Sequence, residues 1–285
     1  MKSLVTGSHG FVGSNLVKHL ENLGDEVITF DLKDGQDILD PCDLIDTFHD
    51  EEPDRVFHLA AQAFMGPGEK NPYLDVDVNV KGMINMLRCL EAYNVPMLYT
   101  SSGAVYGVTP TIPQVETAHC MPMSNYGCSK LAAEYYLKKW VTTKDVDARI
   151  VRFSSVYGAG RLHGPINIFI KQGMEGKPVT VFGDGSQTRD YTYIDDACRG
   201  AVIALSLGSP GEVYNIGSGV ETSVNDIANI IGGYYCVGVE YVAQEYSAFD
   251  LRRSYYDIAK ANRLGYYPKR SVAEGIMMTI DGLRE

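Results

Sequence analysis

A tyrosine and a lysine in the segment NYGCSK have the types and the spacing of a general base and its partner. Tyr126 and Lys130 are four residues apart, so on a helix the two side chains share one face. A cation beside a phenol stabilises the phenolate, and we therefore expect Lys130 to lower the pKa of Tyr126. Such a tyrosine can remove a proton from a hydroxyl group while a hydride leaves the same carbon. The same spacing is common on solvated helix faces, so its weight depends on the surrounding elements.

A pair of serines begins a second segment of interest, SSGAVYG, which follows the apolar run VPMLYT. Polar side chains at the end of a buried strand face the ligand crevice of an open α/β sheet. Ser102 could bridge the tyrosine oxygen and a substrate oxygen, and thereby hold the geometry for proton transfer. The simpler interpretation is a serine that only caps a turn.

Three glycines near the N-terminus, in TGSHGFVGSNL, form a GxxGxxG pattern between an expected strand and an expected helix. In that context Gly7 permits a tight turn, Gly10 lets the backbone approach a pyrophosphate, and Gly13 lets the helix pack on the strand. The backbone N–H groups of Phe11 and Val12 are the expected donors to phosphate oxygens. A glycine-rich turn without a ligand is the alternative, but the strand–turn–helix context favours a dinucleotide.

Acidic residues after the second expected strand indicate which dinucleotide would bind. Asp31 follows the glycines at about the 20-residue interval at which an acid accepts hydrogen bonds from a ribose diol and repels a 2′-phosphate. This predicts NAD rather than NADP, although nearby Lys33 weakens the preference. Asp37 and Ile38 are expected to meet the adenine edge, with an ordinary acid at a helix N-terminus as the alternative for Asp37.

The elements that must position these groups alternate between strand and helix through the first half of the chain. Strands are expected over KSLVTG, EVITFD, RVFHLA, VPMLYT and ARIVRFS, with helices near 11–24, 41–51, 79–93 and 125–141. Such alternation predicts an α/β fold, a Rossmann-like doubly wound parallel sheet with helices on both faces. After residue 155 the segments EVYNIGSG, SVNDIANIIGG and VGVEYV indicate a smaller mixed α/β lobe. We expect an NAD-binding domain over 1–155, joined by part of 186–208, and a substrate-binding lobe over 156–285.

Composition excludes several classes of protein. The 285 residues include 36 acidic and 25 basic side chains, and the net charge of −11 argues against sequence-independent nucleic-acid binding. No apolar run reaches the length of a membrane span, and the N-terminus is typical of a strand and turn rather than a signal peptide. Six scattered cysteines predict reduced thiols in a cytoplasmic protein. The isolated histidines predict no metal site.

The combined motifs resemble those of the extended short-chain dehydrogenase/reductases, in their nucleotide-sugar epimerase and dehydratase branch. The resemblance covers nearly the whole chain and rests on TGSHGFVGS, DILD, HLAAQA, NVKG, SSGAVYG, YGCSK, VYGAG, FGDGSQTRDYTYIDD, NIGSG and RRSYYDIAKANRLGY. It implies a catalytic trio of Ser102, Tyr126 and Lys130, with Lys130 also able to bond the nicotinamide ribose. The NAD contacts that it implies are Gly7, Gly10, Phe11, Val12, Asp31, Asp37, Ile38, the segment Leu59, Ala60, Ala61, Gln62 and Ala63, and Asn79.

The resemblance also implies a nucleoside-diphosphate sugar as substrate. Members of the family clamp the diphosphate with arginines that Arg189 and Arg252 match, and a guanidinium fork suits that group. A surface salt bridge is the alternative for each arginine. Thr180 and Phe182 resemble the segment that flanks the nucleotide base.

Several positions depart from the family pattern around the sugar. Ser155 stands where epimerases commonly have an asparagine that contacts the diphosphate, and Phe64 and Gly68 stand where serines are usual. Ser254 stands where a tyrosine narrows the pocket of strict UDP-galactose 4-epimerases. A small residue there resembles members that admit N-acetylhexosamines.

Two small residues follow Ser102 where other branches of the family carry an acid. The 4,6-dehydratases have Asp-Glu there and the UDP-glucuronate decarboxylases have a glutamate in this segment, whereas this chain has Gly103 and Ala104. Elimination of a C6 hydroxyl needs an acid to protonate the leaving group. We therefore predict a 4-epimerase that acts on a UDP-hexose or UDP-N-acetylhexosamine through a transient 4-keto intermediate, with Tyr126 as base. The two small residues are expected to give the keto-sugar room to turn.

Other interpretations stay open. A dehydratase, a 4-keto-sugar reductase or a 3,5-type epimerase of the same family is one group. The reductase would commonly consume NADPH, against which Asp31 counts, and the 3,5-type needs a second acid/base pair that the sequence does not locate. A non-catalytic NAD-binding protein is the alternative of another class. The family often dimerises through two helices that match 79–93 and 127–141, which predicts a homodimer with a four-helix bundle.

Overall fold

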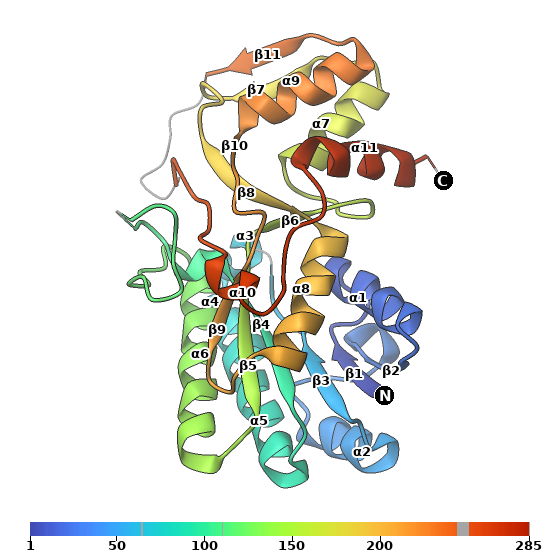
Figure 1. Ribbon diagram of the computed structural model, residues 1–285, viewed down its shortest axis with the longest axis vertical. Helices are drawn as coiled ribbons and strands as arrows, with labels where there is room; N and C mark the ends of the chain where they lie inside the picture. Colours follow the sequence, from blue (N-terminus) through green and yellow to red (C-terminus); the bar gives the residue numbers. More distant parts are fainter. Residues whose placement is uncertain (64, 110, 244–250, 285) are drawn as a thin grey trace.

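The central sheet of the protein has six parallel strands in the order β2-β1-β3-β4-β5-β9 (Figure 1). The computed structural model describes residues 1–63, 65–109, 111–243 and 251–284. The strands of this sheet are β1 (Lys2–Thr6), β2 (Glu26–Phe30), β3 (Arg55–His58), β4 (Met97–Ser102), β5 (Ala148–Phe153) and β9 (Val213–Ile216). The predicted fold class is confirmed.

Alternate residues of the strands enter two separate hydrophobic cores. Leu4, Val56 and Met97 belong to one core, while their neighbours Val5, Phe57 and Leu98 belong to the other. Successive side chains of a strand point to opposite faces, so a strand covered by helices on both faces must be apolar at every position. This explains why the sequence shows continuous apolar runs here instead of alternation.

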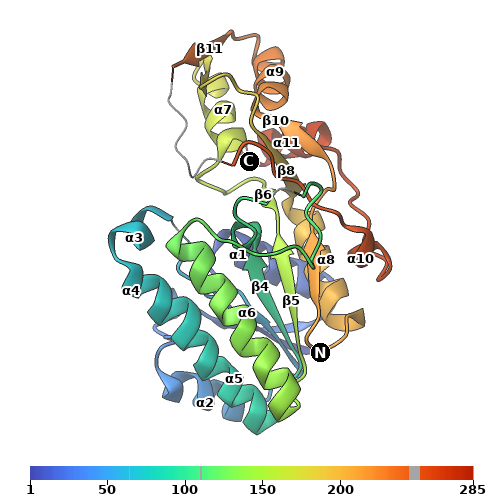
Figure 2. The ribbon, with the colours of Figure 1, turned by 90° about the vertical axis from the view of Figure 1, so that its left-hand side faces the viewer.

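Helices cover both faces of the sheet (Figure 2). The helices α1 (Phe11–Asn22) and α8 (Ile194–Leu207) pack together on one face. The helices α2 (Pro41–Glu51), α5 (Gly82–Tyr93) and α6 (Asn125–Lys144) pack on the other. Between β3 and α5 the chain also forms α3 (Met65–Lys70), α4 (Pro72–Asp75) and the π-helix η2 (Val76–Lys81).

The second, smaller part of the molecule lies beyond the carboxyl ends of the central strands (Figure 1). A three-stranded sheet in the order β10-β8-β6 and a parallel pair β11-β7 pack there with helices. Its elements are β6 (Ser155–Tyr157), α7 (Pro165–Met174), β7 (Val179–Phe182), β8 (Thr188–Tyr193), β10 (Glu221–Ser223), α9 (Val224–Tyr235), β11 (Val239–Val242) and α11 (Val272–Gly282). The remaining short helices are η1 (Leu32–Asp34), η3 (Gly103–Val105) and α10 (Ala259–Asn262).

Two details differ from the sequence-based expectation. The helix expected over 79–93 begins as the π-helix η2 and becomes α-helical only at Gly82. The segment EVYNIGSG, expected in the small lobe, instead supplies β9, which pairs with β5 at the edge of the central sheet. Its pairing partner is distant in sequence, and a short apolar strand does not reveal which sheet it will join.

Within the described part of the chain, no helix is long and apolar enough to span a membrane.

Candidate active site

The glycine turn has the geometry that a dinucleotide phosphate requires. Gly7 has a φ of 70°, and a side chain there would place its Cβ 2.7 Å from the Ala60 backbone nitrogen. A Cβ on Gly13 would lie 2.0 Å from the Gly7 oxygen, so only glycine lets α1 pack this closely on the turn. Gly10 precedes the first turn of α1, whose backbone N–H groups lack helical partners. The turn therefore fits a pyrophosphate held by the backbone at Phe11 and Val12.

The acidic residues of the predicted adenosine side are held by backbone N–H groups. The Asp31 carboxylate accepts hydrogen bonds from the backbone nitrogens of His9 and Lys33, each at 3.0 Å. This arrangement joins the end of β2 to the glycine turn. Asp37 accepts a hydrogen bond from the Leu39 nitrogen at 2.9 Å, and Ile38 is buried against Gly82. Asp37 is thus well placed by local turns, and its contact with an adenine stays a prediction.

A buried asparagine ties the loop after β3 to the helix that carries Tyr126. The Asn79 side chain accepts a hydrogen bond from the Gln62 nitrogen at 2.9 Å and donates to the Gln62 oxygen at 3.1 Å. It also donates to Ser129 Oγ at 2.8 Å, and Ser129 in turn donates to the Tyr126 carbonyl at 2.8 Å. Asn79 therefore aligns the Leu59–Gln62 segment, predicted to line the cofactor, with α6.

The structure brings Ser102, Tyr126 and Lys130 together at the end of β4. The Ser102 hydroxyl accepts a hydrogen bond from the Ala104 nitrogen at 3.2 Å, and its interaction with the Tyr126 phenol acts to lower the pKa of Tyr126. The turn cap is therefore confirmed for this serine, and its role as a bridge between the tyrosine and a substrate stays a prediction. Lys130 is buried, and its Nζ donates to the Thr100 oxygen at 2.9 Å and lies 6.0 Å from the centre of the Tyr126 ring.

The expectation that Lys130 lowers the pKa of Tyr126 is wrong for this structure. Desolvation of the phenol raises the pKa of Tyr126, while the Ser102 hydrogen bond and the Arg161 charge partly oppose the rise. Burial also lowers the pKa of Lys130 to about 7, although the Glu134 carboxylate counteracts it. Spacing on a helix predicted proximity correctly but could not predict burial.

The first serine of the pair, Ser101, has a structural partner that the sequence analysis missed. Its hydroxyl donates to Glu134 Oε1 at 2.6 Å, and Glu134 forms a bidentate ion pair with Arg152 at 2.9 and 2.6 Å. Glu134 and Arg152 are 1% and 2% exposed. The sequence did contain a signal for this ion pair, because Arg152 stands inside the apolar strand ARIVRF. An arginine that is buried there needs a buried acid as its partner.

The space next to Gly103 is already filled by a tyrosine. A Cβ on Gly103 would lie 2.2 Å from the Tyr256 hydroxyl, which donates to the Phe153 oxygen at 2.9 Å. The expectation that Gly103 gives a keto-sugar room to turn is therefore wrong, because the missing side chain accommodates Tyr256. An acidic side chain at position 103 would collide with the same hydroxyl. The packing of Tyr256 therefore leaves no room for the dehydratase acid at position 103.

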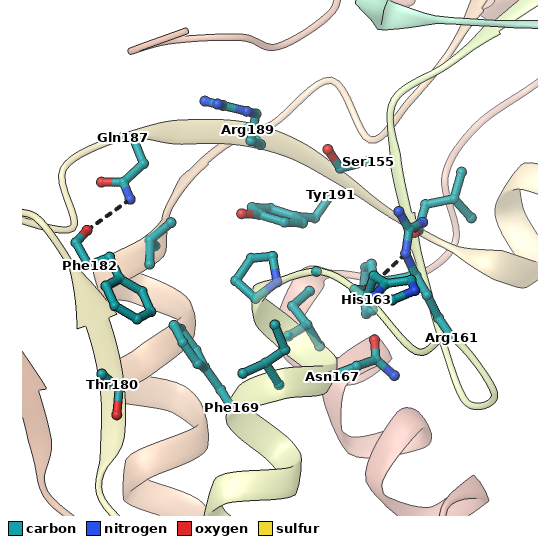
Figure 3. Close-up of a pocket in the computed structure, with 17 residues that line it drawn as sticks. Ser155, Arg161, His163, Asn167, Phe169, Thr180, Phe182, Gln187, Arg189 and Tyr191 are labelled. Atoms are coloured by element: carbon teal, nitrogen blue, oxygen red, sulfur yellow. Dashed lines mark hydrogen bonds between the residues drawn. The ribbon is translucent and has the colours of Figure 1, made fainter. Parts of the chain in front are cut away.

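A cavity of about 410 Å³ lies between β6, α7, β7 and β8 (Figure 3). Four of the predicted substrate residues line it: Ser155, Thr180, Phe182 and Arg189. In Figure 3 the Phe182 ring and Thr180 lie at one end and Arg161 and His163 at the other. The sequence analysis missed the lining residues Arg161, His163, Asn167, Phe169, Gln187 and Tyr191.

Three predicted substrate residues do not line this cavity: Ser102, Arg252 and Ser254. Arg252 is half exposed and forms an ion pair with Asp184 at 3.2 Å, the salt bridge that was its simpler interpretation. The Ser254 hydroxyl donates to Gln114 Oε1 at 3.0 Å. Arg189, in contrast, is anchored by hydrogen bonds to the Thr188 and Leu251 oxygens at 2.7 Å.

Two predicted departures from the family pattern have different outcomes. Gly68 has a structural reason, because a Cβ there would lie 1.9 Å from Asp75 Oδ2. Phe64 lies outside the described residues.

In the described part of the chain, no group of His, Cys, Asp and Glu residues could hold a metal ion.

The site combines the glycine turn of a dinucleotide site, the Ser-Tyr-Lys cluster and the cavity between β6, α7, β7 and β8. Together these features are typical of a nucleotide-dependent enzyme with a Rossmann-like fold. Sequence and structure comparisons agree. The model of the NAD dependent epimerase/dehydratase family matches residues 3–217. A UDP-glucose 4-epimerase of Mycolicibacterium smegmatis is 34% identical, over 100% of this chain and 99% of the relative. A dTDP-glucose 4,6-dehydratase of Streptomyces antibioticus is 31% identical, over 100% and 93%.

A solved structure gives the same result. The crystal structure of UDP-glucose 4-epimerase from Thermotoga maritima with UDP-glucose has a TM-score of 0.93 to this chain, at 32% identity, and the match covers 100% and 99% of the two chains. The protein therefore belongs to the NAD-dependent epimerase/dehydratase family, and its cofactor is NAD.

Proposed function

We propose that the protein is an NAD-dependent 4-epimerase of a UDP-hexose or UDP-N-acetylhexosamine. The observation that carries the proposal is the site itself, a Ser-Tyr-Lys cluster in which the position of the dehydratase acid is Gly103, packed against Tyr256. Similarity to UDP-glucose 4-epimerases over the full chain supports it. Bound NAD supplies reversible hydride acceptance at the sugar C4.

The chain's own residues perform the proton transfer and the positioning. In this proposal the Tyr126 phenolate removes the C4 hydroxyl proton and, after the keto-sugar has turned over, returns the proton to the C4 oxygen. Ser102, which lies beside Tyr126, holds the sugar oxygen and the phenol in line. Lys130 is held by its hydrogen bond to the Thr100 carbonyl, and it would bond the nicotinamide ribose of NAD.

The nucleotide is assigned to the cavity beside this cluster. Arg189, anchored to two backbone oxygens, is placed to bind the diphosphate, with Arg252 as the outer arginine. Thr180 and Phe182 flank the base, and Ser155 faces the sugar side. The apolar ring of Phe182 is 55% exposed, which suits a stacking partner for a base.

The test is a panel of UDP-, GDP-, dTDP- and CDP-hexoses incubated with the enzyme without added cofactor and followed by proton NMR. A sugar inverted at C4, with the amount of bound NAD unchanged, supports the proposal and names the substrate. A new deoxy methyl signal would show dehydration and contradict it. No change across the panel would favour a keto-sugar substrate or a non-catalytic role.

Ser254 is proposed to admit bulky sugars because a larger side chain would narrow the sugar site. Replacing Ser254 by tyrosine should abolish turnover of a UDP-N-acetylhexosamine and spare UDP-glucose, as measured by the same NMR assay. Ser254→Ala is the matched control, since it removes the hydrogen bond to Gln114 without adding volume. Equal losses on both sugars in the tyrosine variant would contradict the role.

We propose that the protein forms a homodimer through α5 and α6, because these helices expose aromatic side chains. The two helices pack together and expose Tyr93, Tyr135 and Tyr136 at 38%, 65% and 40%. Exposed aromatic side chains suit an interface. Light scattering on the eluting protein should give twice the chain mass, and replacing Tyr135 by glutamate should give a monomer. A wild-type protein that elutes as a monomer would contradict the proposal.

A further inference from the structure

One end of the cavity in Figure 3 holds a buried amide whose oxygen is unpaired in the described part of the chain. Asn167 of α7 lines the cavity and is 8% exposed. Its Nδ2 donates to the Gly158 carbonyl at 3.0 Å, and a carbonyl can only accept, so Oδ1 must lie on the other side. This Oδ1 is buried without a hydrogen-bond partner, and Figure 3 shows it on the side of His163 and Arg161. An unpaired buried oxygen is costly, so we expect a ligand group that donates to it.

A fixed guanidinium lies at the same end of the cavity. Arg161 also lines the cavity, and its Nε and Nη1 donate to the backbone oxygens of His163 and Val156. Among the residues that the structure describes, none accepts a hydrogen bond from Arg161 Nη2. Its N–H groups can therefore donate to an acceptor on a ligand. This end of the cavity thus offers an acceptor on Asn167 and a donor on Arg161.

Apolar residues accompany these two polar groups. Pro165 and Ile166 stand in the first turn of α7, just before Asn167, and both line the cavity. A well-matched ligand group therefore has an oxygen for Arg161, an N–H for Asn167 and a small apolar part. An N-acetyl group has all three. A hydroxyl lacks the apolar part, and a phosphate oxygen would face the Asn167 oxygen with no hydrogen between them.

The same end of the cavity adjoins the proposed reaction centre. Arg161 is bonded to β6, which begins shortly after Phe153, the residue of β5 that pairs with Ser102. Its guanidinium also lies 5.8 Å from the ring centre of Phe11, at the start of the helix that follows the glycine turn. Phe182, which is assigned to the base, lies at the opposite end (Figure 3). The ligand group at this end therefore belongs to the sugar.

We propose that Arg161 and Asn167 form a subsite for the 2-acetamido group of a UDP-N-acetylhexosamine. The proposal rests on the proposed function and decides between its two classes of substrate. Arg161 donates to the acetamido carbonyl, and Asn167 Oδ1 accepts from the acetamido N–H. The methyl group packs on Pro165 and Ile166. Glucose has only a hydroxyl at C2, so it makes no such packing. Both polar residues thus determine specificity and move no proton in the reaction.

The experiment compares wild type, Asn167→Leu, Arg161→Met and Arg161→Lys, each with its bound NAD, on UDP-N-acetylglucosamine and UDP-glucose. The NMR inversion assay gives kcat/KM for each sugar nucleotide. Calorimetry gives the affinities for both sugar nucleotides and for UDP alone, in the Tyr126→Phe background, in which turnover is expected to be slow. Matched controls are Asn22→Leu and Arg263→Met, which change exposed residues of the same types.

The wild type is expected to prefer the acetamido sugar in both measurements. Asn167→Leu should lower the ratio of kcat/KM for UDP-N-acetylglucosamine to that for UDP-glucose by about tenfold, the scale set by one lost hydrogen bond. Arg161→Met should lower the same ratio, and Arg161→Lys should recover part of it, because lysine keeps the charge and an N–H donor. The affinity of Asn167→Leu for UDP alone should equal that of the wild type, and both controls should keep the wild-type ratio.

Three results would overturn the proposal. An unchanged ratio in both Asn167→Leu and Arg161→Met would show that neither side chain meets the acetamido group. Equal losses on both sugars would assign the two side chains to a hydroxyl that the sugars share. Weaker binding of UDP alone by Asn167→Leu would assign Oδ1 to the N–H of the base.

Two further features keep the test decisive. If Asn167→Leu does not fold, the Met and Lys variants of Arg161 still test the ratio. Failure of the proposed function looks different from failure of this subsite. In that case the acetamido sugar would still bind more tightly, and Asn167→Leu would still reduce that preference, although neither sugar is inverted.

Discussion

Replacing Tyr126 by phenylalanine is expected to reduce turnover by roughly a hundred- to ten-thousandfold, the range in which general acid–base groups contribute. The variant keeps the ring and loses only the hydroxyl beside Ser102. NAD binding should be retained, because the glycine turn and the Asp31 side of the site do not involve this hydroxyl. The measurements are the NMR inversion assay and the NAD content of the purified protein.

A matched control separates this result from a general loss of structure. Tyr267→Phe removes the hydroxyl of a tyrosine that is 60% exposed and should leave turnover unchanged. Full activity in Tyr126→Phe would show that another group is the base. If wild type and variant are equally inactive on every sugar nucleotide while both hold NAD, the non-catalytic interpretation gains support.

Replacing Glu134 by alanine is expected to lower the free energy of unfolding by about 3–5 kcal/mol, the cost of breaking a buried ion pair by removing one partner. The change leaves the guanidinium of Arg152, 2% exposed, without its carboxylate, and it removes the acceptor of the Ser101 hydroxyl. Arg152 would keep a bond of 3.2 Å to the Glu116 oxygen and its position 4.7 Å from the Tyr106 ring centre. Denaturant unfolding of both proteins measures the difference.

An exposed ion pair on the same helix provides the control. Lys144 of α6 pairs with Glu91 at 2.9 Å, with side chains that are 45% and 38% exposed. Glu91→Ala should leave the unfolding free energy almost unchanged, because exposed pairs contribute little. Similar stability of Glu134→Ala and wild type would mean that α6 or β5 rearranges to bring water to Arg152.

Much of the site could be predicted because its signals are local. The glycine turn depends on residues that are neighbours in the chain, and the structure confirms the need for glycine at positions 7 and 13. Tyr126 and Lys130 lie four residues apart on one helix, as their spacing required. Apolar runs ending in polar residues predicted the parallel sheet and the crevice at its carboxyl edge.

The pKa of Tyr126, the packing of Gly103 and the charges near the base could be decided only by the tertiary structure. Gly103 meets Tyr256, and the charge of Arg161, which is distant in the chain, acts to lower the pKa of Tyr126. The strand β9 pairs with β5 in the central sheet, and the residues of β9 alone could not predict which sheet it would join. Periodicity and spacing report which face of an element is apolar. Desolvation and electrostatic fields depend on distances between elements that are far apart in the chain, and only folding sets those distances.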